Sequence, residues 1–187
     1  RLMAAVDFIR AKAELARLFQ GFEPEVGDEP HIDWIGAVHP LLQLSLERKN
    51  KEKASRNLPA EPAGDVSSQA DATIQEEGDE ARNVPSKVVQ LTRDRHLLII
   101  SGPNAGGKSV CLKTVGLLQY MLQCGLSIPV GNRSTTGIFS DIMIDIGDEQ
   151  SIENDLSTYS SHLMNMKIMM RCATGRTLIL IDEFGTG

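Results

Sequence analysis

The stretch from Gly102 to Ser109 reads Gly-Pro-Asn-Ala-Gly-Gly-Lys-Ser, and it constrains the fold of this chain more than any other. It follows the apolar run Leu97–Ile100 and precedes residues 107–124, where apolar residues recur at helical spacing. Glycines in such a turn let successive N–H groups point inward at phosphate oxygens, and the start of the helix adds its positive dipole end. The spacing is that of a P-loop, and its place between a strand and a helix argues against a chance match.

We therefore predict that this loop binds ATP together with Mg²⁺. Lys108 would reach the β- and γ-phosphates, and the hydroxyl of Ser109 would ligate the metal ion. The predicted cofactor-binding residues are Gly102, Pro103, Asn104, Ala105, Gly106, Gly107, Lys108, Ser109 and Val110.

A second pattern ends the strand predicted over Thr177–Ile181, where an apolar run is followed by Asp182 and Glu183. This is the form of a Walker B element. A parallel sheet places that end of the strand beside the P-loop, where ligands collect in α/β folds. Asp182 would then hold Mg²⁺, and Glu183 would act as the general base toward water. Without the P-loop, an acidic pair that merely ends a strand would be the better interpretation.

Periodicity along the chain predicts an α/β fold with a parallel-rich sheet flanked by helices. Ser157 is the predicted N-cap of the last helix, and Val110 is among the residues expected to face inward from the P-loop helix. The expected helices are 1–20, 107–124 and 157–173, and the expected extended segments or strands are 32–38, 88–91, 97–100, 142–146 and 177–181.

Residues 47–82 differ from the rest of the chain. Lysines and an arginine come first, then prolines, glycine and serines, and a run of acids closes the stretch. Such a composition buries too little apolar area to offset the entropy of ordering, so we predict a disordered insertion. A partner-binding segment is the alternative.

Charge and cysteine usage limit the partners and the compartment. The net charge is −6 and only 4% of residues are aromatic, so few contacts to phosphates or bases are expected from this chain itself. Cys111, Cys124 and Cys172 share no metal-binding spacing, and we expect them to be buried, reduced thiols. With no secretion leader and no membrane-spanning run, we predict a cytoplasmic protein without a membrane partner. The pattern under way at Arg1 and the loop at Gly187 suggest an internal piece of a longer protein.

Several of these stretches together resemble the MutS ATPases. Ser101–Ser109 is similar to the P-loop of that family, and Asp182–Gly187 is similar to its Walker B element and the glycine turn that follows. Asp145–Ile152 and Leu156–His162 resemble one branch in particular, the second bacterial MutS paralogue, which is linked to recombination suppression. The resemblance extends from about Gly36 to Gly187, apart from the insertion, and is most specific over residues 97–187.

The resemblance implies a P-loop ATPase of the ABC-type MutS class. Residues 1–22 would be the end of a lever helix, 23–46 the start of the ATPase domain, and 83–187 its core, ending just after Walker B. Val110 stands where many P-loops have threonine, and the insertion is longer than expected for the family. The family's histidine segment beyond Walker B, its DNA clamp and a C-terminal Smr nuclease domain would lie outside the chain.

The resemblance also implies a homodimer with composite ATP sites. Ser157 and Thr158 would meet the γ-phosphate of the partner subunit, and Asn104 would help position water or phosphate, so Glu183, Lys108 and Asn104 form the predicted catalytic set. The whole protein would bind DNA, with ribosomes and rRNA as a second partner, because this branch is associated with both.

Three other functions remain as alternatives. A P-loop kinase would need arginines over the acceptor, and only Arg171 and Arg176 lie near a suitable place. A transporter-type ATPase would carry Leu-Ser-Gly-Gly where this chain has Leu156-Ser157-Thr158, and a scaffold without turnover would not need Glu183. An acid directly after Asp182 favours water as the acceptor, so ATP hydrolysis is the leading prediction.

Overall fold

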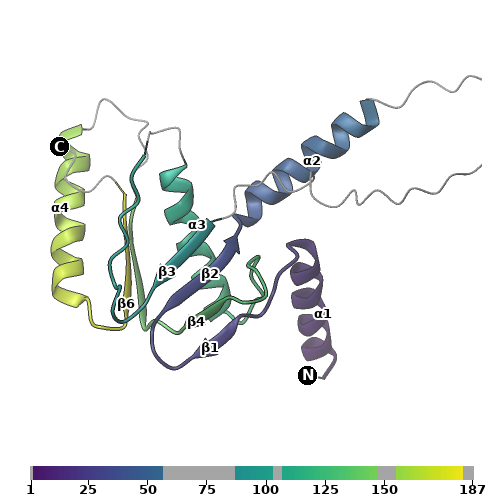
Figure 1. Cartoon of the computed structure of the whole chain (residues 1–187), viewed down its shortest axis with the longest axis horizontal. Coiled ribbons are helices and arrows are strands. Elements are labelled where there is room, and N and C mark those ends of the chain that lie inside the picture. The colour runs from purple at the N-terminus through teal and green to yellow at the C-terminus, as the bar shows by residue number, and fades with distance from the viewer. Residues whose placement is uncertain (1, 57–86, 103–106, 147–154, 183–187) are drawn as a thin grey trace, which may run out of the picture.

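The computed structural model describes residues 2–56, 87–102, 107–146 and 155–182 (Figure 1). Four helices and six strands form within these ranges. The helices are α1 (Leu2–Leu18), α2 (Pro40–Arg56), α3 (Lys108–Gln123) and α4 (Asp155–Cys172). The strands are β1 (Glu25–Gly27), β2 (Ile32–Ala37), β3 (Lys87–Leu91), β4 (Thr135–Gly137), β5 (Asp141–Asp145) and β6 (Thr177–Ile181).

The strands form two sheets on different sides of α3. The larger sheet has the order β1-β4-β2-β3; β1 and β4 are parallel, whereas β2 pairs antiparallel with both β3 and β4. The smaller sheet is the parallel pair β5-β6, in which Asp145 is opposite Ile181. The α/β class is therefore confirmed, whereas the described strands form a mixed larger sheet and do not confirm a parallel-rich one.

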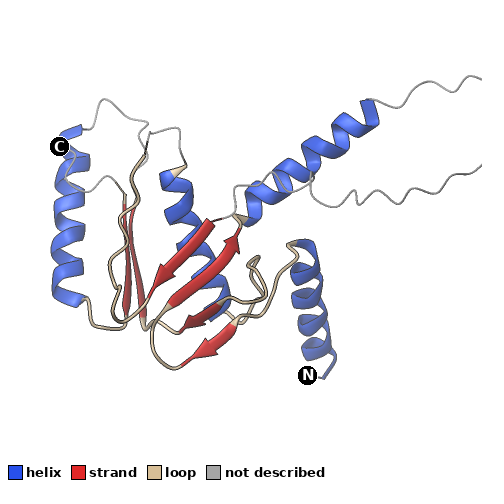
Figure 2. Cartoon of the chain, in the orientation of Figure 1, coloured by secondary structure: helices blue, strands red, loops and turns tan. Residues whose placement is uncertain are grey.

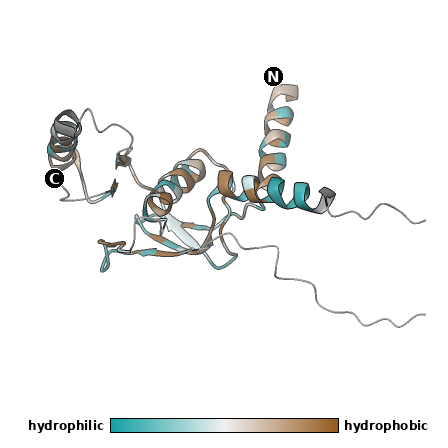
Figure 3. Cartoon of the chain, turned by 90° about the horizontal axis from the view of Figure 1, so that it is seen from above, coloured by the Kyte–Doolittle hydropathy of each residue, from teal (hydrophilic) through white to brown (hydrophobic). Residues whose placement is uncertain are grey.

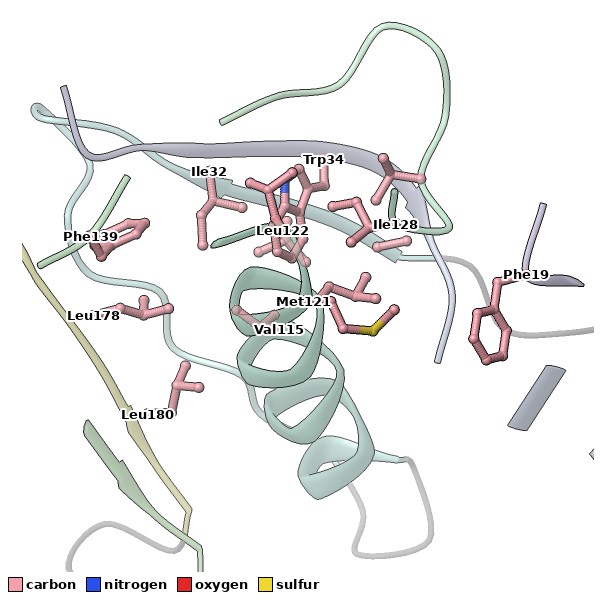
Figure 4. Packing of buried hydrophobic residues seen from close by; sticks show 14 residues of the cluster. Phe19, Ile32, Trp34, Val115, Met121, Leu122, Ile128, Phe139, Leu178 and Leu180 are labelled. Carbon is pink, nitrogen blue, oxygen red and sulfur yellow. The ribbon is translucent and has the colours of Figure 1, made fainter. Parts of the chain in front are cut away.

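Helix α3 is the centre of the hydrophobic core. Its Leu118 and Val115 belong to one buried cluster with Ile32 and Trp34 of β2, both fully buried, and with Leu180 of β6. Figure 4 shows Val115 on α3 between the strand that carries Ile32 and Trp34 and the strand that carries Leu180. The buried residues of α3 include neighbours in sequence, such as Thr114 with Val115 and Met121 with Leu122, so they extend beyond a single stripe of the helix. A helix buried over this width can pack against both sheets. The helix that starts at the P-loop is thus held on both flanks.

The small sheet lies between α3 and α4 (Figures 1 and 3). On the α3 side, the helix approaches closely at Gly116: a Cβ there would lie 2.9 Å from Cδ1 of Leu180 and 3.3 Å from Cδ1 of Ile144. Because neighbouring residues of a strand point to opposite faces, Ile144 and Leu180 mark the α3 face, and Asp145 and Ile181 belong to the α4 face. This alternation decides which acids reach the P-loop side.

The predicted strand Leu97–Ile100 does not form. The segment is a loop between β3 and the P-loop (Figure 2), and Leu97 and Ile99 are 76% and 79% exposed. A strand needs a neighbour to take its backbone hydrogen bonds, and among the described strands β6 pairs only with β5. The composition of the run is that of a buried strand, but its burial requires a pairing partner that the local sequence does not contain.

Helix α2 corrects the expected start of the insertion. It begins at Pro40, which is fully buried, and continues to Arg56, through the first part of the stretch predicted to be disordered. Its start is apolar and the remainder is hydrophilic (Figure 3), which explains why composition alone suggested a break. The rest of the predicted insertion, from residue 57, lies outside the described residues.

Three smaller expectations also change. Val110 is 43% exposed rather than inward-facing. Of the cysteines, only Cys111 is buried, whereas Cys124 and Cys172 are exposed.

Most predicted elements are confirmed. The predicted helices at 1–20, 107–124 and 157–173 are α1, α3 and α4, and the predicted segments at 32–38, 88–91, 142–146 and 177–181 are β2, β3, β5 and β6. None of the helices in the described ranges has the length and apolar character that a bilayer span requires.

Candidate ATP-binding site

Both described ends of the predicted P-loop are glycines with positive φ. Gly102 has φ +152° and Gly107 has φ +75°, values at which a residue with a Cβ is strained. Lys108 then opens α3, and its Nζ donates to the carbonyl oxygen of Gly102 over 2.6 Å. The lysine therefore reaches back across the loop, so that its ammonium group lies where the two ends of the loop approach.

The first turn of α3 supplies further donors. The first backbone hydrogen bond of the helix runs from the N–H of Cys111 to the carbonyl oxygen of Gly107, over 2.9 Å. The N–H groups of the preceding helical residues have no acceptor within the helix and point out of its end. Ser109 lies in this turn and is partly buried. A lysine, a hydroxyl and a positive helix end suit a triphosphate and its magnesium ion.

Asp182 lies at the carboxyl end of β6 and is buried, with 9% exposure. Its N–H donates to the carbonyl oxygen of Asp145 over 2.9 Å, so the last residue of β5 also holds the residue that follows β6. By the alternation of the strand, Asp182 belongs to the same face as Leu180, which is the face toward α3. A carboxylate on that face suits the magnesium role predicted for Asp182.

The carboxyl ends of β5 and β6 and the amino ends of α3 and α4 all lie at the same end of the fold, at the top of Figure 1. Lys108, Ser109 and Asp182 are thereby brought to one end of the molecule from two distant parts of the sequence. Pro103, Asn104, Ala105, Gly106 and Glu183 also belong to the predicted site, and they lie outside the described residues.

Helix α4 starts earlier than expected. It begins at Asp155, so the prediction that Ser157 is its N-cap is wrong. Ser157 lies with Thr158 inside the first turn. The backbone N–H groups of a first turn have no acceptor within the helix, and both residues remain at its positive end. The amino end of α4 lies at the same end of the fold as the amino end of α3 (Figure 1).

Sequence reasoning missed a polar cluster beneath this turn. The carboxyl group of Asp145 is buried, with 5% side-chain exposure. Nδ1 of His162 lies 2.8 Å from its Oδ2, and Nδ2 of Asn165 donates to its Oδ1 over 2.9 Å. Both partners come from α4. The spacing of His162 and Asn165 on one helix face was the available signal, but nothing local indicates that an acid of β5 meets them.

One titratable group near α3 has a shifted pKa. Burial lowers the pKa of His39, and the charge of Lys113 on α3 lowers it further. The imidazole is therefore held in its neutral form more strongly than in water. Its Nδ1 is buried and makes no hydrogen bond to the described residues.

Comparison with known proteins gives the following matches. Residues 98–187 match the family described as MutS domain V. The chain is 35% identical over 186 residues to "Endonuclease MutS2" of Latilactobacillus sakei, 38% over 185 residues to that of Geobacillus kaustophilus, and 39% over 186 residues to that of Agathobacter rectalis. These alignments cover 99–100% of this chain and 19% of each relative, so the chain spans about a fifth of the length of the proteins it matches.

Proposed function

Because the chain belongs to the MutS family, in the branch of its MutS2 relatives, we propose that it is the ATP-binding and ATP-hydrolysing module of a DNA-binding protein. The observation that carries this proposal is the placement of Lys108, Ser109 and Asp182 at one end of the fold. In the whole protein, the ATP cycle would move a clamp on branched DNA and so suppress homologous recombination. An endonuclease activity, as in the relatives' name, would reside in another part of the protein, and ribosome rescue is a second role.

Each residue of the module has a defined task. Lys108 and the N–H groups at the start of α3 bind the phosphates, and Ser109 and Asp182 hold Mg²⁺. When bound, the ion neutralises charge on the phosphate oxygens. Glu183 accepts the proton of the attacking water, and Asn104 orients that water or the phosphate. Lys108 and Ser109 come from the start of α3, and Asp182 follows the end of β6, two elements that the core holds in place.

The position of the arginines favours hydrolysis over a kinase reaction. Arg176 lies just before β6, at the opposite end of that strand from Asp182, and it donates to the carbonyl oxygens of Asp28 (3.0 Å) and Ile138 (3.1 Å). Arg171 is in the last turn of α4, again far along the helix from Ser157. Neither residue lies at the end where a phosphoryl acceptor would bind.

Phosphate release tests the proposed reaction. The full-length protein should release phosphate from ATP in water alone, and branched DNA should change the rate, whereas added sugars and nucleosides should not become phosphorylated. The measurement is free phosphate together with chromatography of each added acceptor. Transfer of the γ-phosphate to any acceptor would support a kinase instead. If branched DNA does not change the rate of hydrolysis, the ATPase activity would still be supported, but its coupling to DNA binding would be contradicted.

The proposal includes a homodimer in which each ATP site is completed by the partner. Ser157 and Thr158, in the first turn of α4, would direct a hydroxyl and backbone N–H groups toward the γ-phosphate bound by the partner's P-loop. The support is their place at the amino end of α4, at the same end as the P-loop. Donors that stabilise the developing charge are often supplied by a second chain in phosphoryl transfer.

Ser157→Asp should separate this role from a structural one. Within its own helix, an aspartate in the first turn is as favourable as serine, because it faces the positive dipole end. Near a partner's γ-phosphate it would instead repel the ligand. We therefore expect the variant to fold and bind ADP but to lose ATP turnover, as measured by phosphate release.

Mixing variants identifies the chain on which Ser157 acts. Dimers of one Ser157→Asp chain and one Lys108→Ala chain contain one intact P-loop facing one intact α4, so activity should return. Differently tagged chains would show that mixed dimers form. No recovery in such dimers would contradict the composite site, and full activity of Ser157→Asp alone would show that Ser157 does not approach the phosphate.

A further inference from the structure

Asp145 joins two parts of the candidate site. The main-chain oxygen of Asp145 accepts a hydrogen bond from the N–H of Asp182, and its buried carboxyl group accepts hydrogen bonds from His162 and Asn165 of α4. It therefore links the strand that ends in the predicted magnesium ligand to the helix that begins with the predicted partner-facing turn. None of the tasks proposed for the ATP site uses these three side chains.

The contacts of α4 explain why a polar cluster is informative here. His162, Asn165 and Met169 recur at three- and four-residue spacing, so they form one stripe of the helix, and Met169 is buried at 6% exposure. Apolar contact alone would let such a helix slide or rotate at small cost, since hydrophobic attraction is not directional. Hydrogen bonds of 2.8 and 2.9 Å from α4 to the two oxygens of one carboxylate fix the position of the helix along its own axis and its rotation about that axis.

Chemistry supports a positioning role over simple packing. An ionised carboxylate can only accept hydrogen bonds, so Nδ1 of His162 carries the hydrogen and Asn165 presents its amide N–H. Burying a carboxylate is unfavourable unless its oxygens are paired, and an apolar residue would fill the same place at less cost. A fully paired acid at the end of β5 therefore gives orientation to α4 that packing would not.

We propose that Asp145 is a positioning residue for ATP turnover. It holds α4 at the axial position and rotation at which its first turn contacts the nucleotide in the ATP site of a second copy of this chain. This inference rests on the composite site proposed above. Asp145 does not touch the nucleotide in this role. It acts through Ser157 and Thr158, which lie one to two turns before His162 on the same helix.

Asp145→Asn tests the proposal in the full-length protein. The amide keeps the volume of the acid but can accept from only one of its two donors, since its NH₂ group faces the other. Misplacement of a catalytic element by about 1 Å costs on the order of 100-fold in rate, so we expect kcat to fall about 10- to 100-fold. ADP affinity should not change. Met169→Leu, in the same stripe but outside the polar cluster, is the matched control and should keep the parent kcat.

Complementation separates positioning in trans from a structural defect. When Asp145→Asn chains are mixed with Lys108→Ala chains, the intact P-loop of the first faces the intact α4 of the second. Activity should return to the level of the Ser157→Asp mixture. A defect of Asp145→Asn confined to its own Asp182 would leave the mixture inactive.

Every outcome decides for or against the role of Asp145. Two results would overturn that role. One is a kcat of Asp145→Asn equal to that of the parent protein. The other is an inactive mixture of Asp145→Asn with Lys108→Ala chains when the mixture of Ser157→Asp with Lys108→Ala chains is active. If the mixture of Ser157→Asp with Lys108→Ala chains is itself inactive, the composite site is contradicted, and so is the role of Asp145 in trans. Should Asp145→Asn fail to bind ADP, Asn165→Ala, which removes one donor and leaves the acid, takes its place with the same expected results.

Discussion

Replacing Lys108 with alanine is expected to abolish measurable ATP binding. Within the sequence Gly102–Ser109, Lys108 is the one cationic side chain, and its Nζ already lies 2.6 Å from the carbonyl oxygen of Gly102, across the opening of the loop. A charge-assisted hydrogen bond to phosphate is about twice as strong as a neutral one, and alanine leaves only backbone N–H groups to hold the triphosphate. Calorimetric titration of ATP into the variant measures the loss.

Lys113→Ala is the matched control for Lys108→Ala. Lys113 lies on the same helix and its removal makes the same change in net charge, but it is more than one turn away and close to His39. We expect Lys113→Ala to bind ATP with an affinity close to that of the parent protein. Equal losses in both variants would mean that general charge, not the geometry of the loop, binds the nucleotide. An unchanged affinity of Lys108→Ala would contradict the P-loop assignment outright.

Glu183→Gln should leave ATP binding intact and slow hydrolysis by roughly 10²–10⁴-fold, the usual contribution of a general base. Glu183 follows directly after Asp182, whose main chain is fixed by the hydrogen bond to Asp145. Glutamine keeps the length of the side chain and one accepting oxygen but cannot take a proton from water. Single-turnover hydrolysis in the full-length protein, with ATP affinity measured in parallel, separates the chemical step from binding.

The control for this variant is Glu52→Gln, on the exposed part of α2, where the same chemical change should have no effect on either quantity. Hydrolysis at the parent rate in Glu183→Gln would show that this acid has a structural task, and the general base would then have to be sought elsewhere. Loss of ATP binding together with hydrolysis would instead indicate that Glu183 belongs to the binding site rather than to the chemical step.

Local patterns in the sequence were sufficient for most elements. Helix α3 follows from apolar residues at three- and four-residue spacing, and β5 follows from alternation around Ile142 and Ile144, because these periods are those of the backbone itself. The glycines of the predicted P-loop also follow a local rule, because Gly102 and Gly107 stand where φ is positive, and glycine adopts such a conformation without strain.

Tertiary structure decided what depends on residues far apart in the chain. Leu97–Ile100 has the composition of a buried strand, but its burial depends on a pairing neighbour that no local pattern specifies. Gln119 is fully buried in α3 because its amide donates to the carbonyl oxygen of Gly137 over 2.9 Å. The cluster around Asp145 likewise appears only when β5 and α4 are packed together. A buried polar side chain is stable only where distant partners satisfy it, so its place cannot be read from its neighbours in sequence.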